Sequence, residues 1–124
     1  MHEYSIASHL LSLCEENFEK ALKDNDLNPL DTKAYISKIV VSIGERSNIE
    51  PKLLESAFSI LQVESPCTKD SILEIIRVPL SFKCETCGHS FYSSTSPLCP
   101  NCNSSHTQIV DGREIRLEKL EIEN

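Results

Sequence analysis

The chain has 124 residues, 40% of them hydrophobic and 25% charged, which is typical of a folded globular protein rather than a disordered one. Twelve basic against nineteen acidic residues give a formal net charge of −7, which disfavours a general nucleic-acid-binding protein. No apolar run approaches the roughly 20 residues that cross a bilayer, and the first residues lack the basic-then-apolar layout of a secretory signal. We therefore expect a cytoplasmic protein with no membrane partner, in a reducing compartment where metal thiolates outlast disulfides.

The first third of the chain predicts one helix and one strand. Over residues 4–22, apolar side chains recur at helical spacing, which predicts an amphipathic helix. Its packing face is expected to contain Ile6, Leu10, Leu13, Cys14, Phe18, Ala21 and Leu22. A polar loop that includes Asn28 and Pro29 ends the helix. Residues 35–43 then alternate as a strand, which Gly44 closes.

The middle of the chain predicts a second helix and a second strand. Pro51 suits the first turn of a helix, because a proline there forfeits no hydrogen bond. The expected buried stripe of this helix contains Leu54, Ala57, Phe58 and Leu61. Residues 72–78 carry β-branched side chains on both faces, which predicts a strand.

The composition changes after Pro79. Residues 83–112 are rich in Ser, Thr and Asn and have too few apolar side chains for a core, so we expect a metal to replace one. From Glu114 the pattern predicts a last strand, in which a β-bulge would explain the slip in apolar phase between Leu117 and Leu120. If that strand returns to the first sheet, the polar stretch is an insert. The predicted fold class is α/β, a small mixed sheet of about three strands with two helices, plus this inserted module.

Four of the six cysteines form two Cys-x-x-Cys pairs, Cys84 with Cys87 and Cys99 with Cys102. Two such knuckles supply four thiolates for a tetrahedral metal, which is the ligand set and spacing of a structural zinc ribbon. Two disulfides or a rubredoxin-like iron site are alternatives that fit less well. No Lys or Arg lies between Cys84 and Gly112, so the module offers no cation to a phosphate backbone and we expect no nucleic-acid partner.

A closed four-thiolate site has no open coordination position, so the functional site is expected elsewhere. The candidate is the start of the chain, Met1-His2-Glu3. The α-amine, the amide nitrogen of residue 2 and the imidazole of His2 suit Ni(II), which accepts tetragonal or square-planar geometry. Glu3 adds a carboxylate, either as a ligand or beside the ligands. Taken alone this signal is weak, because any chain can have a histidine as its second residue.

Several segments together resemble the HypA/HybF family of hydrogenase nickel-incorporation proteins. These segments are the Met-His-Glu-Tyr-Ser start, residues 41–47 with Pro51 and Phe58, the two cysteine knuckles, and the closing residues 112–117. The resemblance covers nearly the whole chain. It implies a nickel-binding α/β domain of residues 1–79 and 113–124, and a zinc-binding domain of residues 80–112.

The resemblance also implies a non-enzymatic metallochaperone. Such a protein passes Ni(II) to the [NiFe]-hydrogenase large subunit or its maturation complex, with the GTPase HypB as partner and a structural Zn(II) as cofactor. Some relatives in urease-producing bacteria support urease maturation, so urease accessory proteins are further expected partners. By the same resemblance His2 is the essential nickel ligand, with the Met1 amine and Glu3 close by, and Glu50 modulates the site. Both a monomer and a homodimer fit.

His89 follows Cys87 by two residues and is a possible modulator of either metal. It either exchanges with a thiolate, with a dependence on pH near roughly 6 to 7, or simply faces solvent. Cys14 is expected to be a small buried hydrophobe. The competing interpretation of the chain is a zinc-ribbon protein-interaction adaptor without a nickel role. A metalloenzyme has little support, because no nucleophile–base arrangement, phosphate loop or open zinc set is present in the sequence.

Overall fold

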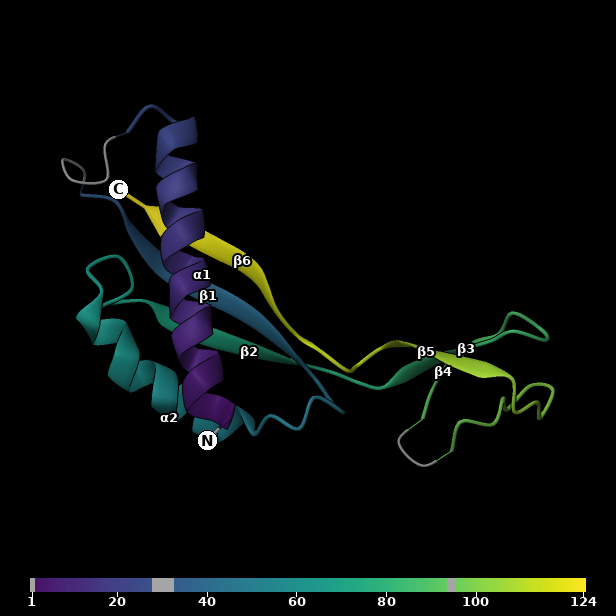
Figure 1. The fold of residues 1–124 in the computed structure, drawn as a ribbon. Coiled ribbons are helices and arrows are strands. Elements are labelled where there is room, and N and C mark those ends of the chain that lie inside the picture. Colours follow the sequence, from purple (N-terminus) through teal and green to yellow (C-terminus); the bar gives the residue numbers. More distant parts are fainter. Residues whose placement is uncertain (1, 28–32, 94–95) are drawn as a thin grey trace. The chain divides into compact units, whose positions relative to one another are not determined.

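The computed structural model describes residues 2–27, 33–93 and 96–124 of the chain (Figure 1). Within these ranges the helices are α1 (His2–Asp24) and α2 (Pro51–Leu61), and a short 3-10 turn, η1 (Gln62–Glu64), follows α2. The strands are β1 (Tyr35–Gly44), β2 (Ile72–Val78), β3 (Ser81–Cys84), β4 (Ser90–Tyr92), β5 (Thr107–Asp111) and β6 (Ile115–Glu123). Both predicted helices and all three predicted strands are confirmed, whereas the predicted loop residues Asn28 and Pro29 lie outside the described residues. None of the described helices is long and apolar enough to cross a membrane.

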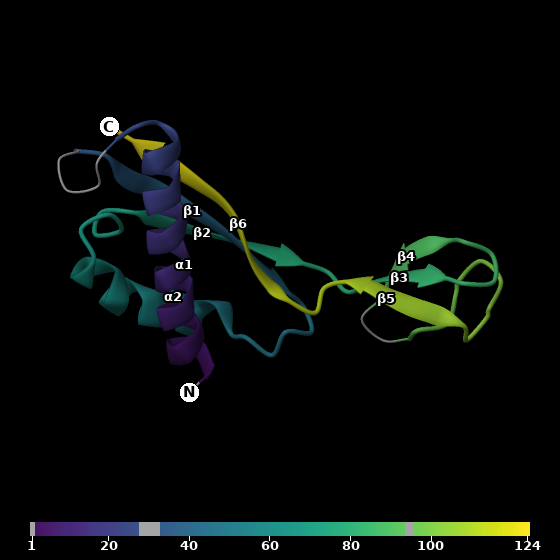
Figure 2. The same cartoon turned by 45° about the horizontal axis from the view of Figure 1, so that its top comes forward.

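The strands form two three-stranded sheets. The first has the order β2-β1-β6, so the last strand of the chain does return beside β1, as predicted. The Ser37 hydroxyl donates to the Glu121 carbonyl at 3.1 Å across this pair. In the second sheet β3 pairs antiparallel with both β4 and β5 (Figure 2). The predicted α/β fold with an inserted four-cysteine module is confirmed.

The chain divides into two compact units, which are described separately below. The helix unit contains residues 1–41, 49–75 and 117–124, and the ribbon unit contains residues 42–48 and 76–116. The ribbon unit therefore includes the glycine turn after β1 in addition to the cysteine module.

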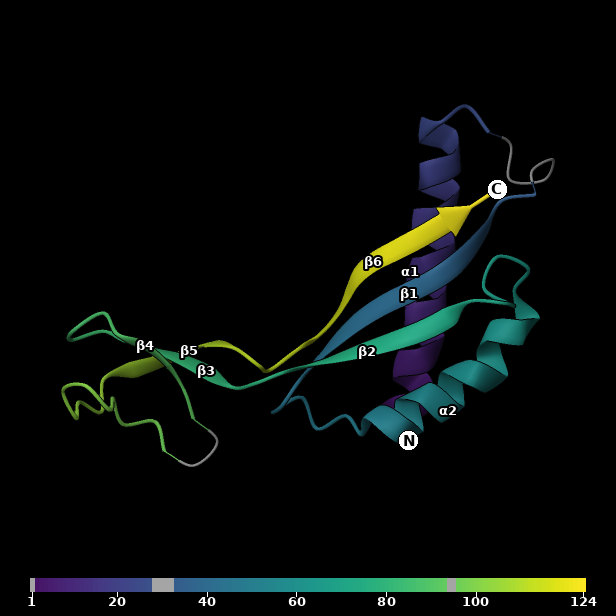
Figure 3. The same cartoon turned by 180° about the vertical axis from the view of Figure 1, so that it is seen from behind.

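In the helix unit, α1 lies across one face of the three-stranded sheet (Figures 1 and 3). The buried residues of α1 recur every three or four positions and are Ala7, Leu10, Cys14, Phe18 and Leu22. Burial of a Leu or Phe side chain contributes roughly 1.5–3 kcal/mol, so this stripe holds the helix on the sheet. The expected face was partly wrong, because Ala7 is fully buried whereas Ile6, Leu13 and Ala21 are only half-buried.

Helix α2 begins at Pro51 as predicted, and Glu50 is its N-cap. A side-chain oxygen of Glu50 accepts a hydrogen bond from the Lys52 backbone N–H at 3.3 Å, which satisfies one of the free amides of the first turn. Leu54, Phe58 and Leu61 are buried, and Ala57 is half-buried. The predicted stripe is therefore largely buried, and α2 contacts α1.

The ribbon unit has a small apolar core of its own. It consists of five buried residues, namely Leu80, Phe82, Cys84, Phe91 and Cys99. The rings of Phe82 and Phe91 stack with their centroids 5.3 Å apart. Leu80 and Phe82 precede the polar stretch of residues 83–112 and were therefore not expected in this core. Two of the five core residues are cysteines of the candidate metal site, which links the packing of this unit to that site.

Candidate metal centre

The four cysteines converge from two separate segments of the ribbon unit. Cys84 ends β3 and Cys87 lies in the turn after it, whereas Cys99 and Cys102 lie in the loop before β5. Their sulfur atoms all lie within 4.8 Å of one another. The Cys84 and Cys102 sulfurs are 3.6 Å apart, and so are those of Cys87 and Cys99. Cys84 and Cys99 are buried, and Cys87 and Cys102 are exposed.

These distances fit one tetrahedral metal and do not fit disulfides. Zn–S bonds of about 2.3 Å at tetrahedral angles place the sulfurs about 3.8 Å apart, close to the separations found here. A disulfide needs a separation of about 2.05 Å. Four thiolates with no open position form the closed donor set of a structural zinc site, and they suit a soft or borderline ion.

The same backbone turn shapes both knuckles. The residue after each second cysteine has a positive φ, 79° at Gly88 and 60° at Asn103. Its N–H donates back to the carbonyl of the first cysteine, Gly88 to Cys84 at 2.9 Å and Asn103 to Cys99 at 2.7 Å. Glycine adopts a positive φ without strain, and asparagine tolerates it better than most residues. This role of Gly88 and Asn103 was not predicted from the sequence, although both residue types at this spacing signal it.

Neighbouring N–H groups stabilise the negative charge on two of the thiolates. The Cys87 backbone N–H donates to the Cys84 sulfur at 3.4 Å, and it is the main cause that lowers the pKa of Cys84 to about 6. The Asn101 side-chain amide, 3.5 Å from the Cys87 sulfur, is the main cause that lowers the pKa of Cys87. Cys84 is therefore largely a thiolate at neutral pH, the form that binds metal. Nothing in the Cys-x-x-Cys pattern pointed to Asn101.

The pKa of the Cys102 thiol shifts in the opposite direction. The Ser104 backbone amide lowers the pKa of Cys102. Desolvation and the neighbouring cysteines raise this pKa by more, so that it reaches about 12. Without a cation, the cluster therefore resists a full complement of four negative charges. A bound dication removes this repulsion, which couples metal binding to proton release.

The second candidate site lies at the start of α1. Met1 is outside the described residues, and the helix begins at His2. The Glu3 carboxylate accepts a hydrogen bond from the Glu50 backbone N–H, with an N···O distance of 3.3 Å. The structure therefore brings Glu3 together with Glu50, the residue expected to modulate the site, across 47 positions of sequence.

The other singled-out residues have simple surroundings. His89 is exposed, does not belong to the four-cysteine group, and stacks on Phe91 with ring centroids 6.2 Å apart. Cys14 is fully buried as predicted, and its burial, followed by the effects of Cys67 and Glu15, raises its pKa to about 12. His9 is exposed on α1.

Comparisons with known proteins agree with this architecture. The sequence model of the family described as "Hydrogenase/urease nickel incorporation, metallochaperone, hypA" matches residues 1–122. The chain is 39% identical to the hydrogenase maturation factor HypA of Wolinella succinogenes, over 99% of this chain and 96% of that protein. It is 36% identical to the hydrogenase/urease maturation factor HypA of Helicobacter pylori, over 98% and 97% of the two chains.

Two solved structures are also similar to the chain. The solution structure of the Ni metallochaperone HypA from Helicobacter pylori has a TM-score of 0.64 at 37% identity, and the match covers 96% of this chain and 95% of that one. A second solution structure, of HypA protein, has a TM-score of 0.68 at 37% identity over 98% and 95% of the two chains. The fold, the cysteine cluster and these matches lead to one conclusion: the chain belongs to the HypA family of metallochaperones for hydrogenase and urease nickel incorporation.

Proposed function

We propose that this chain binds Ni(II) through Met1, His2 and Glu3 and delivers it for [NiFe]-hydrogenase maturation. The N-terminal amine, the amide nitrogen of residue 2 and the His2 imidazole are the nitrogen donors, a set that suits tetragonal or square-planar Ni(II). The role is metal transfer, with the nickel as cargo and not as a resident cofactor. Family membership supports the metal, and the residue chemistry supports the site.

The hydrogen bond between Glu3 and Glu50 is the observation that carries this proposal. One oxygen of Glu3 accepts from the Glu50 N–H at 3.3 Å, and an oxygen of Glu50 accepts from the Lys52 N–H at 3.3 Å. Both carboxylates are therefore oriented by backbone amides next to the start of α1. Groups that orient a ligand carboxylate typically affect metal affinity about 10–100-fold. We assign this positioning role to Glu50.

The surroundings of Glu3 suit a protein that gives its metal away. Glu50 is exposed and Glu3 is half-buried. Ligands of an open site can be exchanged one by one for those of an acceptor, whereas a closed cage releases its ion slowly. We expect the acceptor side to include the GTPase HypB and the hydrogenase large subunit or its maturation complex. Urease accessory proteins are further candidate partners, and both a monomer and a homodimer are compatible with this role.

We propose that Cys84, Cys87, Cys99 and Cys102 hold a resident structural Zn(II). The 3.6 Å sulfur separations and the lowered pKa of Cys84 support this assignment. The zinc would crosslink two segments of a unit in which the described residues around the cluster form a core of five. In this division of roles the α/β part of the chain, residues 1–79 and 113–124, binds nickel, and residues 80–112 bind zinc. His89 remains a proposed modulator.

Calorimetry of nickel binding to untagged protein tests the nickel site. His2→Ala is expected to abolish specific Ni(II) binding and to leave the zinc content and the fold intact. Glu3→Gln is expected to weaken binding about 10-fold, because it removes the carboxylate that the Glu50 backbone N–H orients. His9→Ala is the matched control, because His9 is an exposed histidine on the same helix.

A second arm separates this site from a protein-interaction adaptor without a nickel role. An extension of two glycines before Met1 removes the α-amine from its place, so it should weaken nickel binding as strongly as His2→Ala does. Unchanged nickel affinity in both His2→Ala and the extended protein would refute the assignment. Equal losses in His2→Ala and His9→Ala would mean non-specific histidine binding, and would refute it as well.

A further inference from the structure

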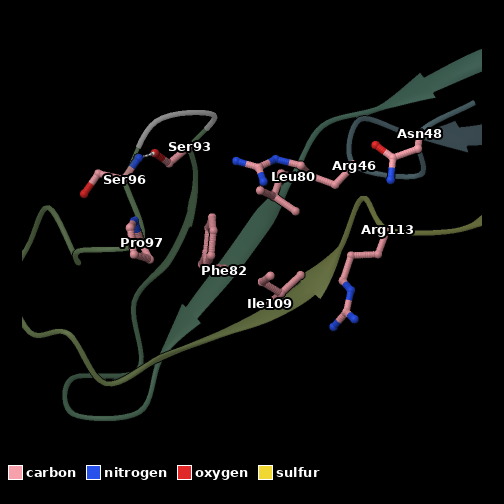
Figure 4. Close-up of a pocket in the computed structure, with 9 residues that line it drawn as sticks. All are labelled: Arg46, Asn48, Leu80, Phe82, Ser93, Ser96, Pro97, Ile109 and Arg113. Atoms are coloured by element: carbon pink, nitrogen blue, oxygen red, sulfur yellow. Dashed lines mark hydrogen bonds between the residues drawn. The ribbon is translucent and has the colours of Figure 1, made fainter. Parts of the chain in front are cut away.

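The ribbon unit contains a cavity of about 510 Å³, and none of the functions proposed above involves it (Figure 4). Its lining residues come from the glycine turn after β1, from β3 and β5, and from the loops beside them. They are Arg46, Asn48, Leu80, Phe82, Ser93, Ser96, Pro97, Ile109 and Arg113. None of them is a candidate metal ligand.

The charge of this unit differs from that of the chain as a whole. The ribbon unit has five basic and four acidic side chains, although the complete chain has a net charge of −7. The cation-free stretch from Cys84 to Gly112 therefore does not describe the whole unit. Its basic residues come from the flanking segments, and two of them, Arg46 and Arg113, line the cavity.

Both cavity arginines are available to a ligand. Among the described residues, the ion pairs of the ribbon unit are those of Arg116, with Asp111 at 3.5 Å and with Glu114 at 3.2 Å. Arg46 and Arg113 have no such partner. Glu45, the acidic neighbour of Arg46, accepts a hydrogen bond from the Leu80 backbone N–H at 3.0 Å and is directed to the backbone.

The floor of the cavity is apolar. Leu80 and Phe82 belong to the small core, and Ile109 is 38% exposed. Because Leu80 and Phe82 are only 3% and 6% exposed, a ligand on this floor removes chiefly the apolar surface of Ile109 from water, which stabilises the complex. The site therefore combines an apolar floor with cationic groups at its edge.

The direction of the two arginines decides which kind of ligand fits. In Figure 4 their guanidinium groups point in different directions, so one small anion does not meet both. A ligand with several carboxylates spaced along a chain does, and the cavity volume lies in the range of sites for ligands larger than an inorganic ion. We propose that this cavity binds an acidic segment of a partner protein, with carboxylates on Arg46 and Arg113 and an apolar side chain against Leu80, Phe82 and Ile109. This inference is independent of the nickel site.

Fluorescence anisotropy with a labelled hexapeptide of alternating glutamate and leucine tests the proposal on the full zinc-loaded chain. Arg46→Gln and Arg113→Gln are each expected to weaken peptide binding about 10-fold, because each removes one guanidinium–carboxylate contact. Arg77→Gln is the matched control: it removes the same charge in the same unit, from a residue that does not line the cavity. Backbone amide NMR shifts on peptide addition are expected at Leu80, Phe82 and Ile109.

Several results would overturn the proposal. These are unchanged affinity in both cavity variants, an equal loss in Arg77→Gln, or amide shifts confined to other residues. Equal binding of a lysine–leucine peptide would refute the carboxylate contacts, and equal binding of a glutamate–serine peptide would refute the apolar one. Arg46-dependent binding of a uridine oligonucleotide, without binding of the acidic peptide, would point to nucleic acid instead.

Discussion

The three glycines of this chain provide a quantitative test of how the ribbon unit is built. Gly112 has φ of 97°, and a Cβ added there would lie 2.6 Å from the Leu80 Cα and 2.7 Å from the Pro79 carbonyl oxygen. Gly88 has a similar φ of 79°, but an added Cβ meets nothing within 4 Å. At Gly44 an added Cβ would overlap the carbonyl group of Gly112. The three positions thus separate backbone strain from steric overlap.

The expected loss in free energy of unfolding follows from these two contributions. A left-handed conformation costs a non-glycine residue about 1–2 kcal/mol, and an extra methyl group in a packed place costs about 1–3 kcal/mol. Gly88→Ala should therefore cost about 1–2 kcal/mol through strain alone, and Gly44→Ala about 1–3 kcal/mol through overlap. Gly112→Ala suffers both effects, so it should exceed Gly88→Ala by about 1–3 kcal/mol.

Urea unfolding of the zinc-loaded protein, followed by NMR of ribbon-unit amides, measures these differences. Hydrogen exchange of the Arg46 amide provides a local readout, because it donates to the Gly112 carbonyl at 2.8 Å. In Gly112→Ala this amide should exchange faster, and in Gly88→Ala it should not. If Gly112→Ala costs no more than Gly88→Ala, the close approach of Gly112 to residues 79 and 80 does not exist in solution.

Three further predictions concern the two cores and the metal. Phe58→Ala should lower the free energy of unfolding in urea by about 3–5 kcal/mol, because Phe58 is fully buried. Ile60→Ala on the same helix, at a side chain 64% exposed, should lower it by less than about 1 kcal/mol. The pKa of Cys14 is raised from 9.0 to about 12, so the unfolded chain loses this proton at a lower pH than the folded chain does. The free energy of unfolding should therefore fall as the pH rises from 9.0 towards 12. Cys14→Ala should flatten that part of the stability–pH curve. Removal of zinc by a chelator should collapse the NMR dispersion of the ribbon-unit amides and leave that of the helix-unit amides unchanged, because two of the five ribbon-core residues are cysteines of the cluster. Retained dispersion in the ribbon unit would contradict a structural metal.

Much of the fold follows from local patterns along the chain. The period of apolar residues predicted α1 and β1, Pro51 marked the start of α2, and β-branched residues marked β2. The two cysteine knuckles identified the metal cluster from their spacing alone, since a tetrahedral thiolate site restricts how its ligands are arranged. These features depend on helical and strand periods and on a ligand pattern that spans 18 positions, from Cys84 to Cys102, so one sequence is enough to recognise them.

Other features depend on which distant segments meet, and tertiary structure alone decides them. Packing of α1 in the folded chain buries Ala7 and leaves Ile6 half-buried, although both are apolar. Folding also places Asn101 beside the Cys87 sulfur and the Glu3 carboxylate beside the Glu50 amide.

The cavity with Arg46 and Arg113 has the same origin. Its two arginines stand on either side of the cysteine module in the sequence, and the hydrogen bond from the Arg46 amide to the Gly112 carbonyl joins their segments. Periodicity and ligand spacing, which are properties of short segments, predicted both helices, the strands β1, β2 and β6 and the thiolate ligands, but not the short strands β3, β4 and β5. The carboxylate pair and the cationic cavity required the folded chain, because their groups become neighbours only through long-range packing.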